Sequence, residues 1–265
     1  MERHRRIAPH PRSRGEHVTP YPDRRYFTRI AKDTGFRPEP LETVYRLTSL
    51  LNQVTTVHGP ELSLRGGTAL NLIHLDLPRL SVDIDLDYIG SADPDSAQQR
   101  RPRILASLEA ISERAGYAVR AERASYAMAH LRLAYVNTVG RPAFLKLDVN
   151  FLDRVPVLPT EQHPLTHPFP HDLPEIMVET LALAELAAAK LVALARRSLP
   201  RDLFDSAMLS TLPNLDIGLM RTVLVVRGSS YHPHPRPTTH PLWPTGYGPP
   251  DGDPKYSHCA DAPSR

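Results

Sequence analysis

The sequence predicts an α+β fold, and three patterns support this prediction. Residues 81–89 alternate apolar and acidic side chains, which is the pattern of a β-strand with one polar face. Three further strand-like segments follow at 117–123, 128–137 and 143–152. Apolar residues recur at three- and four-residue steps after two prolines, as on one face of a helix: Leu41, Val44, Leu47, Leu51 and Val54.

The elements before residue 115 follow in order from local signals. A helix is expected over 39–57, and a short strand over 61–65 that ends at two glycines. A second helix, 68–75, begins directly after that turn. The alternating strand comes next, and a helix at about 95–115 follows, in which Pro102 is expected to break or delay the first half.

The elements after residue 115 are a hairpin and two helices. The segment 138–142 is turn-like and predicts a hairpin between the last two strands. A long Ala/Leu-rich helix is expected over 175–198. A further helix over 200–210 would have Ser198 as its cap and Pro200 in its first turn.

Both ends of the chain differ in composition from the middle. Residues 1–25 carry seven Arg against three acidic residues, and residues 228–265 carry nine Pro without any periodicity. We therefore expect a disordered basic arm at 1–25, a core at 26–160, a helical C-terminal part at 161–227, and a disordered Pro-rich tail at 228–265.

Composition limits the class of protein. The formal net charge is +3 with 13 His, which is compatible with a polyanionic partner. A single cysteine, Cys259, excludes an internal disulfide. No apolar stretch approaches the roughly 18 residues of a membrane helix, and no secretory signal is recognised. A cytoplasmic protein without a membrane partner is expected.

The acidic strand predicts a metal site. Asp83 and Asp85 project from one face of the strand, where their carboxylates could hold hard divalent cations such as Mg²⁺. Asp148 lies on the polar face of another strand, two residues after Lys146, and strand pairing would bring it beside them. Three carboxylates could hold two ions in nucleotide chemistry. The alternative is an ordinary solvated sheet face.

The glycine turn predicts a phosphate contact. Gly66 and Gly67 would let backbone N–H groups approach an anion at the start of the helix that contains Thr68. The alternative is a simple turn. Similarly, Lys190 in its Ala-rich helix could contact phosphate or be a solvated helical charge.

Four motifs, in this order along the chain, resemble the AbiEii/AbiGii family. This family comprises nucleotidyltransferase-like toxins of bacterial toxin–antitoxin and abortive-infection systems, and it is similar to the superfamily that includes DNA polymerase β. The resemblance covers Phe27 to Met208 and implies a polymerase-β-like mixed sheet with flanking helices. The motifs are LRGGTALNL, RLSVDIDL, LKLDVNF and LAAAKLVALARRSLPRDLFD.

The resemblance also implies roles for individual residues. Metal ligands would be Asp83, Asp85 and Asp148; with Lys190 they would form the catalytic set. Asp87 receives no catalytic role. Nucleotide-binding positions would be Gly66, Gly67, Thr68, Arg79, Ser81, Lys146, Arg201 and Asp202. Asp205 belongs to the last motif and shares a helix face with Asp202. Two roles are open for these aspartates: they touch the nucleotide, or they orient Lys190.

The implied activity is transfer of a nucleoside monophosphate from an NTP to RNA, notably a tRNA 3′ end, with two Mg²⁺ ions and a cognate antitoxin. The chain departs from the family after residue 208, where the helical C-terminal part looks truncated. Two alternatives follow: an inactive NTP- or RNA-binding remnant, and a phosphotransferase that uses the same site. A phosphate on Ser81 would add negative charge beside the metal site, through which an antitoxin could silence the enzyme.

Overall fold

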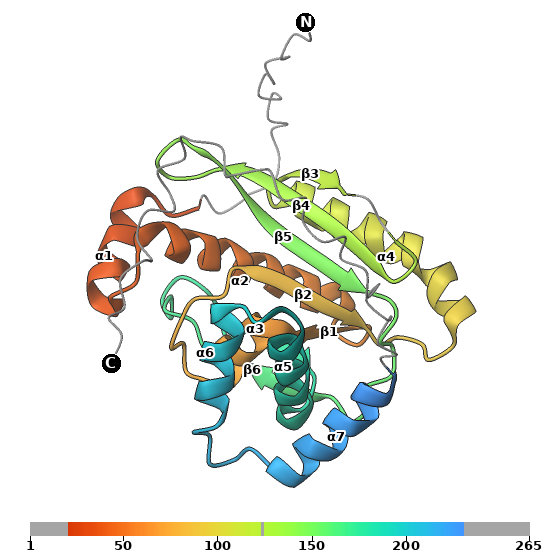
Figure 1. Ribbon diagram of the computed structural model, residues 1–265. Helices are drawn as coiled ribbons and strands as arrows, with labels where there is room; N and C mark the ends of the chain where they lie inside the picture. The colour runs from red at the N-terminus through yellow and green to blue at the C-terminus, as the bar shows by residue number, and fades with distance from the viewer. Residues whose placement is uncertain (1–20, 123–124, 231–265) are drawn as a thin grey trace, which may run out of the picture. The chain divides into compact units, whose positions relative to one another are not determined.

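The computed structural model describes residues 21–122 and 125–230 (Figure 1). Within these residues one mixed sheet has seven strands in the order β3-β4-β5-β2-β1-β7-β6. The strands are β1 Leu62–Arg65, β2 Asp83–Tyr88, β3 Ala118–Ala121, β4 Met128–Val136, β5 Pro142–Asn150, β6 Glu161–Pro164 and β7 Met177–Thr180. The α+β prediction is confirmed.

The helices flank this sheet on both faces. They are α1 Arg24–Thr34, α2 Pro38–His58, α3 Gly66–Ala69, α4 Pro94–Arg114, α5 Leu183–Arg197, α6 Pro200–Leu209 and α7 Ile217–Ser230. α3 continues into a π-helical turn, η1, over Leu70–His74. In Figure 1, α2 and α4 lie behind the sheet, whereas α3, α5 and α6 lie in front of β1 and β2.

Strand pairing fixes the positions of the acidic residues. β2 runs parallel to β5, with Asp85 opposite Asp148, and antiparallel to β1, with Arg65 opposite Asp85. Because paired residues point to the same face of a sheet, these three side chains share one face. The prediction that strand pairing brings Asp148 beside the Asp pair is confirmed.

The core lies on the opposite face of the same strands. Ile84 and Leu86 of β2 alternate with the acidic residues and are buried, as are Leu147 and Val149 of β5. The strict alternation of residues 82–88 therefore separates an apolar face, which packs against helices, from a polar face that carries the acids. Within the described residues, no helix is both long and apolar enough to cross a lipid bilayer.

Pro102 does not interrupt its helix. α4 runs unbroken from Pro94 to Arg114. Pro102 is exposed, so the carbonyl deprived of its helical donor can bond to water instead. The buried side of α4 is anchored by Arg101, whose guanidinium donates to the carbonyl oxygens of Ser125 and Tyr126.

The helix expected over 175–198 begins only at Leu183. Residues 177–180 form β7, which pairs with β6 and β1. Ile176, Val178 and Thr180 are buried while Met177 is exposed, so this segment has the two-residue period of a strand. Ser198 also differs from expectation: it ends α5 with φ 49°, and Leu199 is the N-cap of α6.

The expected divisions of the chain differ from the structure in three places. α7 continues to Ser230, inside the expected Pro-rich tail. α1 begins at Arg24, inside the expected basic arm. β6 and β7 lie inside the expected helical part and belong to the common sheet. The described residues up to Gly228 form one compact unit. Residues 1–20 of the expected arm and residues 231–265 of the expected tail lie outside the described residues.

Candidate active site

Three carboxylates gather on the open face of β2 and β5. Asp83 and Asp85 are two residues apart on β2, and Asp148 lies opposite Asp85 on β5. The side chains of Asp83 and Asp148 are 34% and 26% exposed. The cluster is therefore accessible from solvent while its central member is more enclosed.

Burial raises the pKa of Asp85 above its usual value. Arg65 on the neighbouring strand opposes this rise, whereas the charges of Asp148 and Asp83 add to it. Repulsion among carboxylates is what a bound cation would relieve. Burial thus disfavours the negative charge of Asp85.

His130 is a member of this site that the sequence reasoning missed. Its Nδ1 lies 2.8 Å from Oδ1 of Asp148, and the two residues are paired across β4 and β5. The signal was available, because His130 falls on the polar face of the alternating segment 128–137. Its partner could not be read without the register.

The two glycines are required by close contacts. Gly66 has φ 72°, and a Cβ there would lie 2.5 Å from Oδ2 of Asp85. A Cβ on Gly67 would lie 2.9 Å from Nη2 of Arg79 and 3.0 Å from Oγ of Ser81. The turn is thus packed directly against the acidic strand and the segment that leads into it.

Thr68 and Ser81 connect this turn to the start of β2. Thr68 is fully buried, and its hydroxyl lies 3.0 Å from the hydroxyl of Ser81 and within hydrogen-bonding distance of the carbonyl oxygen of Asp83. Ser81 is 8% exposed. Both hydroxyls therefore hold the glycine turn and the acidic strand together.

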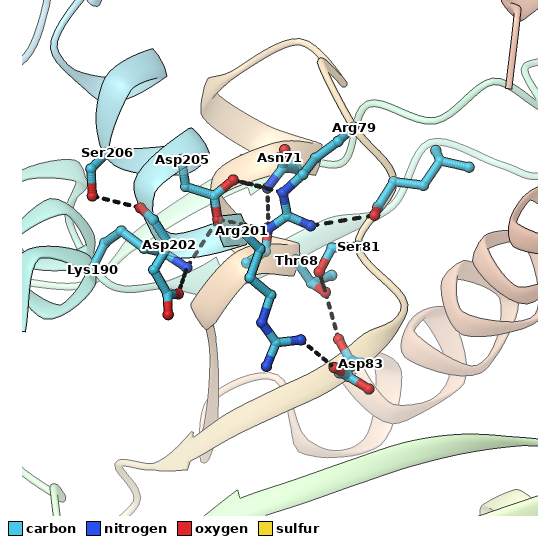
Figure 2. A network of polar contacts seen from close by, with 12 residues as sticks. Thr68, Asn71, Arg79, Ser81, Asp83, Lys190, Arg201, Asp202, Asp205 and Ser206 are labelled. Atoms are coloured by element: carbon cyan, nitrogen blue, oxygen red, sulfur yellow. Dashed lines mark hydrogen bonds and ion pairs between the residues drawn. The ribbon is translucent and has the colours of Figure 1, made fainter. Parts of the chain in front are cut away.

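Lys190 lies between two buried carboxylates. Its Nζ is 3.2 Å from Oδ1 of Asp202 and 2.9 Å from Oδ2 of Asp205, and its side chain is 6% exposed (Figure 2). Asp202 also accepts hydrogen bonds from Arg197, which, with those from Lys190, lower its pKa to about 2. Both aspartates thus contact Lys190, as expected if they orient it, which is one of the two roles left open by the sequence.

Arg79 joins the same network from the segment before β2. Its guanidinium donates to both oxygens of Asp205, at 2.7 and 2.6 Å (Figure 2). Burial raises the pKa of Asp205, but the hydrogen bonds from Arg79 and Lys190 outweigh burial and lower it. Helix α6 is thereby tied to the segment that carries Ser81 and leads into Asp83.

Two arginines from the α5–α6 turn stand beside the acidic pair. Arg201 lies 3.7 Å from Oδ2 of Asp83 and its side chain is 51% exposed. The side chain of Arg197 is 49% exposed; its hydrogen bonds to Asp202 raise the pKa of its guanidinium, and the charge of Asp85 adds to this rise. Arg197 was missed by the sequence reasoning, because only the fold brings the end of α5 close to β2.

The three carboxylates suit a hard cation by their chemistry. Mg²⁺ prefers oxygen ligands, which these carboxylates supply from adjacent strands, and the charges of Asp148 and Asp83 add to the rise that burial causes in the pKa of Asp85. In residues 21–122 and 125–230, however, no three Asp, Glu, His or Cys side chains converge as ligands of one ion. His130 contacts one oxygen of Asp148, and Arg201 lies 3.7 Å from one oxygen of Asp83.

Asp87 belongs to a different environment from Asp83 and Asp85. It is fully buried, lies 3.2 Å from Arg65, and accepts a hydrogen bond from Asn150 at 2.8 Å. Among the described residues its Oδ2 has no hydrogen-bond partner. Lys146, in contrast, is exposed and lies opposite Asp83.

The comparisons with known proteins agree with this arrangement. Residues 49–255 match the model of the family described as nucleotidyl transferase AbiEii toxin, type IV toxin–antitoxin system. Among curated protein sequences, none is significantly similar to this chain.

A solved structure shares the fold of this chain, and two others match it with lower similarity. MenT4, a nucleotidyltransferase toxin of Mycobacterium tuberculosis, is 21% identical with a TM-score of 0.54, over 76% of this chain and 69% of its own. JHP933 of Helicobacter pylori is 17% identical with a TM-score of 0.48, over 66% and 67%. The antibiotic-resistance factor ANT(2″)-Ia is 15% identical with a TM-score of 0.42, over 70% and 92%.

Proposed function

This chain belongs to the AbiEii family of nucleotidyltransferase toxins. We propose that it transfers a nucleoside monophosphate from an NTP to the 3′ end of an RNA, and that this RNA is a tRNA. The observation that carries the proposal is the accessible cluster of Asp83, Asp85 and Asp148 beside the exposed Arg197 and Arg201. Carboxylates for metal ions next to cations for phosphate are the parts that phosphoryl-group chemistry needs.

We place the triphosphate of the NTP between the glycine turn and the two arginines. Gly66 lets the backbone of the turn lie directly against Asp85, and Arg201 lies 3.7 Å from Asp83. Arg197, which donates to Asp202, adds positive charge that acts on Asp85. Lys190 is held by two aspartates, so in our proposal it stabilises the arginine-bearing turn. This revises the direct phosphate contact expected from the sequence.

Asp83, Asp85 and Asp148 are the residues proposed to hold Mg²⁺. When bound, the ions would neutralise phosphate charge and lower the pKa of the attacking hydroxyl. The family and the donor types support this proposal.

The chain's own residues supply the proton transfer. The acceptor hydroxyl oxygen forms a bond to the α-phosphorus as the bond from that phosphorus to pyrophosphate breaks. We assign the hydroxyl proton to the carboxylate of Asp148, which His130 orients from 2.8 Å. Pyrophosphate leaves on the side of Arg197 and Arg201.

Regulation belongs to the same proposal. A type IV toxin–antitoxin family implies a cognate antitoxin as partner. Modification of Ser81 by the antitoxin would first have to release its hydroxyl from Thr68, because that side chain is 8% exposed.

Two labels distinguish the proposed reaction from its alternatives. Purified protein with Mg²⁺ and total tRNA should move label from one α-³²P-NTP onto RNA and none from γ-³²P-NTP. Label from γ-³²P-NTP on any acceptor would identify a phosphotransferase instead. Binding of NTP or RNA without any transfer, across all four NTPs, would identify an inactive remnant.

A further inference from the structure

A row of three basic side chains crosses the exposed face of the sheet and ends at Asp83. Arg120 of β3 lies opposite Arg132 of β4, Arg132 lies opposite Lys146 of β5, and Lys146 lies opposite Asp83 of β2. Directly opposed residues point to the same face, so the four side chains form one line across four strands. With strands about 4.8 Å apart, the line extends about 14 Å from Asp83.

These basic side chains face solvent. Arg120, Arg132 and Lys146 are all exposed, whereas Leu131 and Leu147, on the other face of β4 and β5, are buried. Among the described residues, none of the three forms an ion pair; the ion pairs on this face involve His130, Arg65 and Arg201. Their charge is thus available to a ligand.

An aromatic ring lies beside this row, because Phe144 precedes Lys146 by two residues on β5 and shares its face. Phe144 is 41% exposed, and the guanidinium carbon of Arg132 lies 3.6 Å from the centre of its ring. An exposed aromatic ring combined with cations is the combination that binds unpaired nucleotides, because the ring stacks on a base while the cations contact phosphates.

We propose that this basic row, Arg120, Arg132 and Lys146 with Phe144, binds the single-stranded 3′ end of the RNA acceptor and leads its terminal hydroxyl to Asp83. The inference rests on the proposed function for the identity of the acceptor. The row leaves Asp83 on the side of β5, away from the glycine turn, Arg197 and Arg201. Acceptor and triphosphate therefore approach the acidic cluster from different sides.

Binding of RNA tests the row without requiring transfer. We compare the variant Arg120→Gln/Arg132→Gln with Arg103→Gln/Arg114→Gln, which removes the same charge from exposed positions on α4. Fluorescence anisotropy with a labelled single-stranded RNA, in the absence of NTP, should give at least a tenfold weaker affinity for the first variant and less than a twofold change for the second. Loss of two phosphate contacts should also reduce the slope of log affinity against log salt by about 1.4.

Acceptor length gives a second readout. A dinucleotide is too short to reach from Asp83 to Arg120, so wild type and Arg120→Gln should use it equally. A longer single-stranded acceptor should show a raised KM and an unchanged kcat in Arg120→Gln. An equal effect on both acceptors would contradict the proposed path.

The outcomes separate this inference from the proposed function. The proposal that the basic row binds RNA is overturned if wild type and the row variant bind RNA equally. It is also overturned if the α4 control weakens binding as much as the row variant does. Both results hold whether or not transfer occurs. If the row variant loses more affinity for an acidic peptide than for RNA, the row binds a protein partner, and the proposal is overturned as well. Row-dependent RNA binding without transfer by the wild type supports the row and rejects the enzymatic activity.

Discussion

Gly66 has no Cβ, and a Cβ at this position would both strain the backbone and collide with Asp85 of the acidic cluster. Its φ of 72° lies in the left-handed region, where a side chain costs about 1 to 2 kcal/mol. Gly35 has nearly the same φ, 76°, but among the described residues no heavy atom outside its own chain neighbourhood lies within 4 Å of the position of its Cβ. Substitution of Gly35 therefore tests backbone strain alone, whereas substitution of Gly66 tests backbone strain together with the contact with Asp85.

Gly66→Ala should abolish nucleotidyl transfer, whereas Gly35→Ala should leave transfer near that of the wild type. Both variants should lose a similar 1 to 2 kcal/mol or so of unfolding free energy from backbone strain, with an added loss at Gly66. Urea denaturation and the transfer assay measure the two effects. Equal activity in the two variants would show that the contact with Asp85 does not matter.

Asp87 predicts a pH dependence of stability. Its complete burial raises its pKa from 3.8 to about 6, although Arg65 lies 3.2 Å away. Between these two pH values the folded protein holds a proton that the unfolded chain has lost. Stability supplied by the protonated form is therefore present below pH 3.8 and is lost as the pH rises through about 6.

Asp87→Asn should remove this dependence. Relative to wild type, its free energy of unfolding should increase between pH 4 and 6 or so, by up to roughly 3 kcal/mol, because Asn cannot ionise. Urea denaturation at a series of pH values checks the slope. A difference between the two proteins that does not vary with pH would mean that Asp87 titrates normally.

At the scale of elements, Asp205 joins α6 to α5 and to the segment before β2. It is fully buried and accepts hydrogen bonds from Arg79, while Lys190 lies 2.9 Å away. Neutralising it would leave Arg79 without its carboxylate partner. Lys190 would keep only Asp202, which Arg197 also contacts. Removing one partner of a buried ion pair costs about 3 to 5 kcal/mol.

Asp205→Asn should therefore unfold at lower urea and also lose transfer activity, because the segment that leads into Asp83 is no longer fixed. Asp33→Asn, at an exposed position on α1, is the matched control and should change stability by less than about 0.5 kcal/mol. If both variants unfold at the same urea concentration as wild type, the network does not hold α6 in place.

The helices and strands differ in how well local sequence predicts them. The strand of residues 83–88 was predictable because its alternation is strict, and the helix of residues 38–58 because its apolar stripe is regular. β7 was not, since Met177 and Glu179 fit a helix as well and only pairing with β1 and β6 makes them a strand. The solvent-facing position of Pro102, which lets α4 continue, is likewise a tertiary property.

At the scale of the whole molecule, the sheet register brings together what the sequence separates. Asp83, Asp85 and Asp148 could be predicted because each lies on an alternating segment and matches a motif. Arg65 and His130 could not, because their proximity depends on which residues pair across strands. The burial of Lys190 between two aspartates was also beyond prediction, since an Ala-rich helix does not reveal which of its faces is covered.

The most direct test of the account is the amount of α-³²P-labelled nucleotide transferred to tRNA by wild type, Asp85→Asn and Asp87→Asn. All three proteins are compared at the same degree of folding, verified by circular dichroism. The account predicts transfer by wild type and Asp87→Asn and a loss of at least about 100-fold for Asp85→Asn. Undiminished transfer by Asp85→Asn would contradict it.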